Sequence, residues 1–276
     1  MLTIFNFKRM VLQAFHVMPI QAAESNPSPT ATKIVSIDEI QFTIPDSLQL
    51  SKIADEPLIH WPVAAAWDRD GSLVVLESNW NRESVEKQLV SRPHRIVRLQ
   101  DIDTDGVFDK RTVIASDLSF SAGILVFENA IYVSAPPSIL RLEDLDGDGI
   151  FEDRKTWHEG KTITHCANDL HGPLLGRDGW IYWTKGAFAE QSLPMRDGST
   201  LNSRAAHLLR RHPSGGGVEV MMTGGMDNPV DVAFLPTILN SQGCRWTCWQ
   251  KCGRPVTRSP WPRLKASCEP GETLMK

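Results

Sequence analysis

The chain has 276 residues, of which 41% are hydrophobic and 22% charged, as in an ordinary globular protein that can bury a sizeable core. The formal net charge is -4 and no basic patch stands out, which argues against a protein that binds nucleic acid. No apolar run approaches the ~18 to 20 residues that a spanning helix needs, so we expect no membrane span.

The first residues, 1–24, have the order of charges and apolar residues of a signal peptide. Lys8 and Arg9 precede the apolar run MVLQAFHVMPI, and two small alanines follow it. A disordered N-terminus is the alternative, because a glutamine and a histidine interrupt the apolar run. We predict a periplasmic or secreted protein, with a cytoplasmic location as the alternative. Residues 25–39, which begin SNPSPTAT, are interpreted as a linker.

Short apolar segments separated by turns fill residues 40–235. Two of them, SLVVLE and WIYWTKG, follow the dipeptides Asp70-Gly71 and Asp178-Gly179, which suit tight hairpin turns. No segment of this region shows the apolar period of a helix. We therefore predict an all-β body with strands at 63–68, 72–77, 122–127, 130–135, 172–176 and 180–186.

A longer pattern repeats within this body. RIVRLQDIDTDGVFDKRTVIA (95–115) matches SILRLEDLDGDGIFEDRKTW (138–157), and HLLRRHPSGGGVEVMMT (207–223) is a weaker copy with Ser-Gly-Gly-Gly in place of the aspartates. Four short antiparallel strands over roughly 40 to 50 residues describe one blade of a β-propeller. We expect an incomplete β-propeller, and an all-β sandwich is the alternative. The expected blades lie at 61–115, 120–157 and 168–223, a fourth begins at 228–234, and 40–53 is a candidate strand for closing the ring.

Residues 236–276 differ in character from the body. They lose the alternation of strands and are rich in Trp, Cys, Arg and Pro. Cys244, Cys248 and Cys252 form a C-x3-C-x3-C run without the C-x2-C pairs of structural zinc sites, and a metal cluster is the less favoured interpretation. We interpret the segment as an abnormal tail, explained by an out-of-frame reading, and expect a truncated propeller.

The turn inside each strong repeat has the ligand pattern of a calcium loop. Alternate aspartates followed by glycine match the first ligand positions of such a loop, and hard oxygen ligands favour Ca²⁺. The last position, normally a bidentate Glu, is Thr112 in one copy and Lys155 in the other, so a solvated acidic turn is the alternative to a weak structural calcium site. The predicted ligands are Asp101, Asp103, Asp105 and Asp109 in the first turn, and Asp144, Asp146, Asp148 and Glu152 in the second.

Three stretches of the body resemble a known family. They are SLQLSKIADEPLIHWPVAAAWDRDGSLVVLE, the two turns of the type RLxDxDGDGxF, and NDLHGPLLGRDGWIYWTKGAFAEQ. These look like the membrane-bound dehydrogenases of planctomycete-type bacteria, exported proteins whose six-bladed propeller is similar to soluble quinoprotein glucose and sorbosone dehydrogenases. The resemblance covers residues 40–235. It implies pyrroloquinoline quinone (PQQ), calcium, and hydride abstraction from a small carbohydrate or alcohol with the help of a histidine base.

The residues that would carry this activity are matched only in part. Where those dehydrogenases place the base histidine, this chain has Asn168, which cannot act as a base. His171, three positions later, is the catalytic candidate, and Asp169 is the candidate that orients its imidazole. In a second motif, G-x-R-N-P, Asp227 stands in place of the cofactor-binding Arg, and Asn228 is the matching cofactor-binding candidate.

Two functions follow from these patterns. The first is a fragment of a PQQ-dependent sugar or alcohol dehydrogenase propeller, inactive in this form because the ring is not closed. The second is a non-catalytic propeller, braced by calcium, that binds a glycan or a protein. An open ring also exposes a strand edge, so we expect a protein partner across that edge. Glu77 and Lys185 are predicted at strand ends near the mouth of the ring, as ion pairs or as rim charges.

Overall fold

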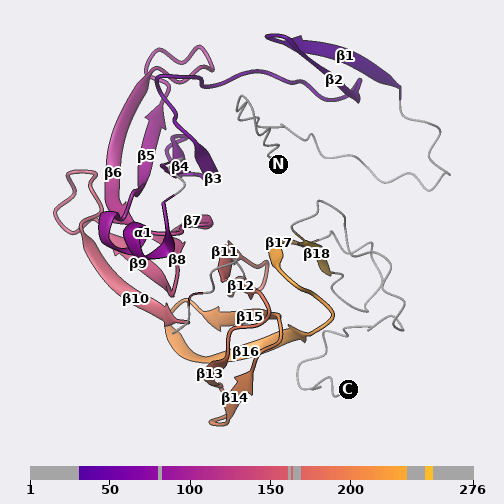
Figure 1. Cartoon of the computed structure of the whole chain (residues 1–276). Coiled ribbons are helices and arrows are strands. Elements are labelled where there is room, and N and C mark those ends of the chain that lie inside the picture. Colours follow the sequence, from indigo (N-terminus) through magenta and orange to yellow (C-terminus); the bar gives the residue numbers. More distant parts are fainter. Residues whose placement is uncertain (1–30, 80–82, 161–162, 164–168, 235–245, 251–276) are drawn as a thin grey trace.

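The computed structural model describes residues 31–79, 83–160, 163, 169–234 and 246–250. Within these residues nearly all regular structure is strand, and the larger sheets are antiparallel, four-stranded and built from consecutive segments of the chain. Figure 1 shows the sheets following one another along an arc. The predicted fold class, an all-β partial propeller with three four-stranded blades and the start of a fourth, is confirmed.

Each complete blade starts with an inner strand and ends with an outer one. The inner strands contact each other in order around the arc, β3 with β7, β7 with β11 and β11 with β17. The strands of the three blades are β3 (Pro62–Trp67), β4 (Leu73–Glu77), β5 (His94–Gln100) and β6 (Lys110–Leu118); β7 (Gly123–Phe127), β8 (Ala130–Ala135), β9 (Ser138–Glu143) and β10 (Asp153–Glu159); and β11 (Leu170–Leu175), β12 (Ile181–Lys185), β15 (His207–His212) and β16 (Gly215–Thr223).

A hairpin and a short helix within the blades were not predicted from the sequence. A hairpin of β13 (Gln191–Pro194) and β14 (Thr200–Ser203) is inserted between β12 and β15 of the third blade. A seven-residue helix, α1 (Val85–Ser91), lies between β4 and β5, and the side chain of Ser84 caps its first turn. None of its residues is buried, which explains why no apolar period reveals it. No helix in the described part of the chain is long and apolar enough to cross a membrane.

The two ends of the body differ from the sequence prediction. β1 (Thr32–Ile37) pairs with β2 (Ile40–Pro45) in a separate two-stranded sheet, so part of the expected linker is a strand. The segment 40–53, a candidate strand for closing the ring, thus contributes β2 to this separate sheet. At the other end, β17 (Pro229–Phe234) pairs with β18 (Trp246–Gln250), five residues of the expected tail. The expected signal peptide and the rest of the tail lie outside the described residues.

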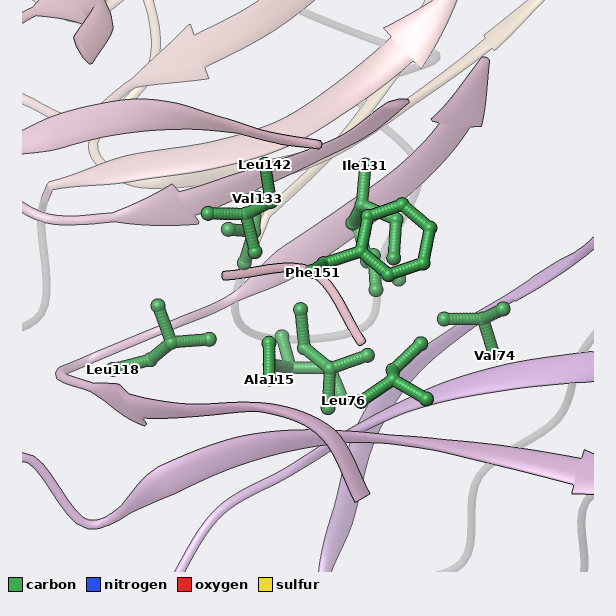
Figure 2. Packing of buried hydrophobic residues seen from close by; sticks show 11 residues of the cluster. Val74, Leu76, Ala115, Leu118, Ile131, Val133, Leu142 and Phe151 are labelled. Carbon is green, nitrogen blue, oxygen red and sulfur yellow. The ribbon is translucent and has the colours of Figure 1, made fainter. Parts of the chain in front are cut away.

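Apolar clusters between successive blades hold the arc together. The cluster between the first two blades takes Val74, Leu76 and Ala115 from one blade and Ile131 and Phe151 from the next (Figure 2). A second cluster joins the second and third blades around Trp157 and Trp183, whose rings meet edge to face with centroids 5.4 Å apart. Burial of these side chains between sheets is the main favourable term for docking one blade on the next.

Each outer strand carries at least one β-bulge. Such a bulge leaves Ile114 of β6, Trp157 of β10 and Met221 of β16 without a partner on the neighbouring strand. The carbonyl of Ile114 accepts a hydrogen bond from the backbone N–H of Phe151 at 2.7 Å, and the carbonyl of Trp157 accepts one from Arg211. Both donors belong to the next blade. The bulge thus frees a backbone carbonyl of the outer strand for contact between blades.

Candidate functional site

The first blade buries a carboxylate at the end of its second strand. Glu77 ends β4 and is fully buried. Its Oε2 atom lies 2.8 Å from Arg95 and 2.8 Å from Arg111, and its Oε1 accepts the backbone N–H of His60 at 2.8 Å. A buried charge needs such partners to offset the loss of its hydration. Of the two alternatives predicted for Glu77, the structure has the ion pair. The contact with His60 also holds the segment that leads into β3.

The third blade buries a lysine at the matching position. Lys185 ends β12 with 1% of its side chain exposed, and its Nζ donates to the carbonyls of Ala189 at 2.7 Å and Ala205 at 3.3 Å. Burial lowers the pKa of Lys185 to about 8, although nearby Asp169 opposes the shift. The two carbonyls stand before β13 and after β14, so Lys185 fastens the base of the inserted hairpin.

A histidine that the sequence did not single out lies beside this lysine. His207, the first residue of β15, is paired across the sheet with Lys185 and is fully buried. Its Nδ1 lies 3.1 Å from the hydroxyl of Thr223, and no hydrogen-bond partner for its Nε2 is found in the described structure. Burial, together with the charge of Lys185, lowers the pKa of His207 to about 4, so the ring is neutral near neutral pH.

The predicted catalytic and cofactor candidates meet at the same end of the third blade. His171 lies in β11, and its Nε2 is 3.0 Å from Oδ1 of Asn228, just before β17. Asp169 is buried immediately before β11, where its carbonyl accepts the N–H of Gly186. Asp227 accepts the N–H of Ala187 with its own carbonyl. The structure therefore brings His171, Asp169 and Asn228 together; the orientation of His171 by Asp169 stays a prediction.

These residues do not fit the quinone cofactor that the resemblance implies. PQQ carries carboxylates, and the motif position that would supply a cationic partner holds Asp227. Lys185, a buried cation at the same end of the blade, already directs its ammonium group to two backbone carbonyls. His171 faces the amide of Asn228, so the candidate base and the candidate cofactor ligand contact each other. We therefore derive no redox step for this site.

The second Asp-rich turn gathers its predicted ligands into one cluster. One ligand oxygen from each of four predicted residues lies within 4.8 Å of the others, and the residues are Asp144, Asp146, Asp148 and Glu152. Partial desolvation acts to raise the pKa of Asp144, but the donating backbone amides of Gly149 and Gly147 outweigh it and keep this pKa below its usual value. The carboxylate of Asp144 is thus held ionised by the turn, as a cation ligand must be.

The first Asp-rich turn gathers fewer ligands. Oxygens of Asp101, Asp103 and Asp109 lie within 4.8 Å of one another, but the fourth predicted ligand, Asp105, is not part of this group. The carboxylate of Asp105 accepts the backbone N–H of Val107 at 2.8 Å, as that of Asp148 does with Ile150 in the second turn. Asp101 closes the turn by accepting the N–H of Gly106, as Asp144 does with Gly149 in the second turn. The two turns share a conformation, and the second offers the larger set of oxygen ligands.

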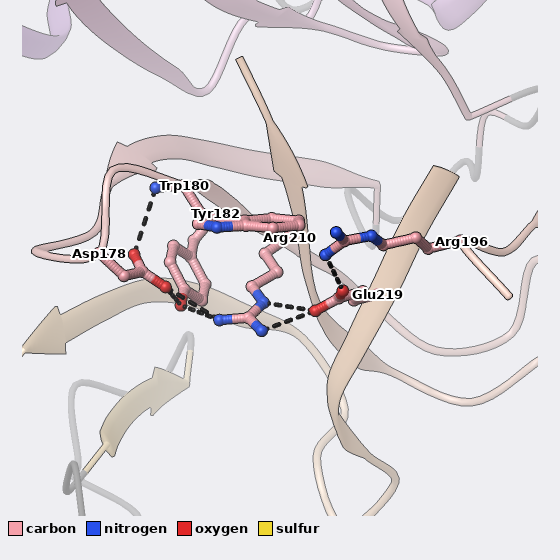
Figure 3. Close-up of polar contacts among 6 residues, drawn as sticks. All are labelled: Asp178, Trp180, Tyr182, Arg196, Arg210 and Glu219. Atoms are coloured by element: carbon pink, nitrogen blue, oxygen red, sulfur yellow. Dashed lines mark hydrogen bonds and ion pairs between the residues drawn. The ribbon is translucent and has the colours of Figure 1, made fainter. Parts of the chain in front are cut away.

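A polar network at the opposite end of the third blade was also missed. Arg210 of β15 donates to Glu219 and to Asp178, and its guanidinium lies 4.6 Å from the ring centroid of Trp180 (Figure 3). Arg196 from the turn of the inserted hairpin pairs with the same Glu219 at 2.7 Å. The network joins the hairpin to β15 and β16. Its charges are paired with each other, which is typical of a structural role.

Comparison with known proteins places this architecture in a family. A family model described as a domain of unknown function, DUF7133, matches residues 36–228, more than half of the chain. The chain belongs to the DUF7133 family. It is also similar to a chain in the crystal structure of a nidogen–laminin complex, at 15% sequence identity and a TM-score of 0.46, over 81% of this chain and 72% of that one. The comparison with curated proteins found no match.

Proposed function

We propose that this DUF7133 domain is a non-catalytic propeller module, braced by calcium at its Asp-rich turns, that binds a glycan or a protein. The observation that carries the proposal is the convergence of Asp144, Asp146, Asp148 and Glu152 within 4.8 Å. Four carboxylates so close repel one another unless a cation lies between them. The turn joins β9 to β10, so a bound Ca²⁺ would stiffen the outer part of the second blade.

The contacts of three titratable residues at one end of the blades support a binding role over catalysis. Glu77 is held by two arginines, Lys185 by two carbonyls and His171 by Asn228. Groups committed to such contacts position loops at one end of the blades, and loops on a rigid scaffold are where binding surfaces usually lie. A periplasmic or secreted location would suit the proposal, because extracellular modules bind calcium with Kd values of about 10⁻⁴ to 10⁻³ M.

Calcium titration tests the proposal. We expect Ca²⁺ to raise the free energy of unfolding, by about 2.7 kcal/mol when its concentration is 100 times Kd. The double variant Asp146→Asn/Asp148→Asn should lose most of this gain, since it removes two charges but keeps oxygen acceptors of the same shape. Asp197→Asn is the matched control, because Asp197 caps an Asp-Gly turn of the inserted hairpin outside both clusters. Equal calcium responses in both variants would contradict the proposed site.

The same preparation tests the dehydrogenase alternative. After incubation with PQQ and Ca²⁺ followed by gel filtration, we expect no quinone absorbance with the protein and no oxidation of sugars or alcohols by a dye-linked assay. A stoichiometric quinone band that is weakened by Asn228→Ala would overturn the non-catalytic assignment. It would return His171 and Asn228 to the roles that the resemblance implies.

A further inference from the structure

The segment Gln49–Ala54, between β2 and the first blade, occupies the place of an outer strand. The carbonyl of Ile53 accepts the backbone N–H of Phe108 at 2.8 Å. At the next blade interface, the carbonyl of Ile114 accepts the backbone N–H of Phe151 at 2.7 Å. Phe108 and Phe151 are the same position of the two strong repeats, so Ile53 relates to the first blade as Ile114 of β6 relates to the second.

The buried residues of the two segments also occupy equivalent positions. Ile53 and Ala54 pack in a cluster with Val75, Leu99 and Phe108 of the first blade. Ile114 and Ala115 pack in the cluster that contains the corresponding residues of the second blade, Val133, Leu142 and Phe151. In both places an Ile-Ala pair is at least nine-tenths buried against the face of the blade that follows it.

Spacing along the chain is similar at the two places. Ile53 precedes Ala64 of β3 by 11 positions, and Ile114 precedes Gly123 of β7, which has the same cross-strand register as Ala64, by nine. Aligned at the Ile-Ala pair, Gln49–Ala54 is the equivalent of Lys110–Ala115, the first six residues of β6.

The two segments differ in how their backbones are paired. Lys110–Ala115 is hydrogen-bonded to β5, the third strand of its blade. Gln49–Ala54 belongs to no sheet, and in the described part of the chain its recorded backbone hydrogen bond is the one from Phe108. Among the described residues no strand is paired with this outer-strand equivalent, and its edge continues the interface between blades.

We propose that the edge of Gln49–Ala54 is a docking site for an extended strand of another polypeptide, which adds to it as the third strand of a blade. The three complete blades indicate the chemistry of that strand. Their third strands read HRIVRLQ, SILRLE and HLLRRH, with branched apolar residues and an arginine near the end. A strand of this type would bury its apolar residues beside Ile53 and pair its backbone with the free edge. This inference is independent of the calcium proposal, because it uses neither Asp cluster.

Hydrogen exchange with the full chain tests the inference. The probe is a capped synthetic peptide with the sequence of residues 94–101, and the control peptide carries Val97→Pro and Leu99→Pro, which remove ladder donors. In the free chain, the amides of 50–54 should exchange much faster than those of 111–115. With the probe at ten times Kd, exchange at 50–54 should slow about tenfold, while the control peptide has no effect.

Variants of the segment show whether its backbone edge is the binding element. Ser51→Pro/Lys52→Pro removes donors at two successive positions, one of which faces the edge because N–H groups alternate along a strand. This variant should lose the response to the probe. Ser51→Ala/Lys52→Ala, which equally removes the contacts of Lys52 with Asp38 and Asp55, should keep it.

Several results would overturn the proposal. One is slow exchange at 50–54 in the free chain at all concentrations, which would mean that the edge is already covered. Another is slowing that grows with the concentration of the chain alone, which would assign the edge to a second copy. An equal effect of both peptides, slowing confined to β6, β10 or β16, or no slowing with the probe would each refute strand addition at this segment.

Discussion

The buried carboxylate of Glu77 allows a sharp test of how much burial strengthens an ion pair. Glu77→Gln keeps the shape of the side chain and the oxygen that accepts the N–H of His60, but removes the charge shared by Arg95 and Arg111. Hydrogen bonds to charged groups contribute about 1.5–3 kcal/mol each. Arg95 is 41% exposed and Arg111 20%, so water will replace part of what each loses. We expect the variant to lose about 2–4 kcal/mol of unfolding free energy.

Glu219 provides the matched control. It also bridges two arginines, Arg196 and Arg210, but it is 25% exposed and lies in the network at the far end of the third blade. Exposed pairs contribute about 0–1 kcal/mol, so Glu219→Gln should cost no more than that. Urea unfolding followed by tryptophan fluorescence would measure both variants, with equal m-values as the sign of a shared two-state transition. If Glu77→Gln costs no more than Glu219→Gln, burial does not set the strength of these bridges.

Two further predictions concern pH. The folded pKa of Lys185 is about 8 against 10.5 for an ordinary lysine, so the unfolded chain binds more protons between these values and stability should rise with pH there. Lys185→Met should flatten this rise in pH-dependent urea unfolding, and an unchanged slope would refute the burial of the charge. The ring of His158 is tilted against that of Trp183, with centroids 4.5 Å apart. Burial lowers the pKa of His158 from 6.5 to about 3, so its contribution to stability is complete above pH 6.5 and is lost as the pH falls toward 3. His158→Phe should reduce acid destabilisation in that range, whereas an identical acid midpoint would contradict the prediction.

Much of the fold could be predicted because the signals of a blade are local. Strands such as Leu73–Glu77 and Ile181–Lys185 follow Asp-Gly turns and consist of apolar and branched residues, and both were predicted within two residues of their observed bounds. The elements that were missed lack such signals. β1 begins in a stretch interpreted as a linker, and α1 has no buried face. Such elements are stabilised by their neighbours or by caps rather than by an apolar pattern of their own.

The candidate functional residues also fall into those that local sequence signals reveal and those that only the fold reveals. The Asp-rich turns were recognisable because their ligands lie within nine residues of each other, and backbone amides of the same turn hold Asp101 and Asp144. His207 gave no signal of its own. Its importance comes from its cross-strand position beside Lys185, 22 residues away in the chain. The partners of Glu77 were equally hidden, because Arg95 and Arg111 come from two later strands.

The sequence by itself determined the repeat, the order of the strands and the register of the aspartates, because each depends on residues that are close in the chain. Only the tertiary structure shows which charged side chains are buried and which segment packs against the face of each blade. The clearest case is Gln49–Ala54. The sequence indicated only that 40–53 contains a candidate strand for closing the ring. The hydrogen bond between Ile53 and Phe108 identifies Gln49–Ala54 as the equivalent of an outer strand. This equivalence depends on how the segment docks on the first blade. Docking is controlled by side-chain packing between segments that are distant in the chain.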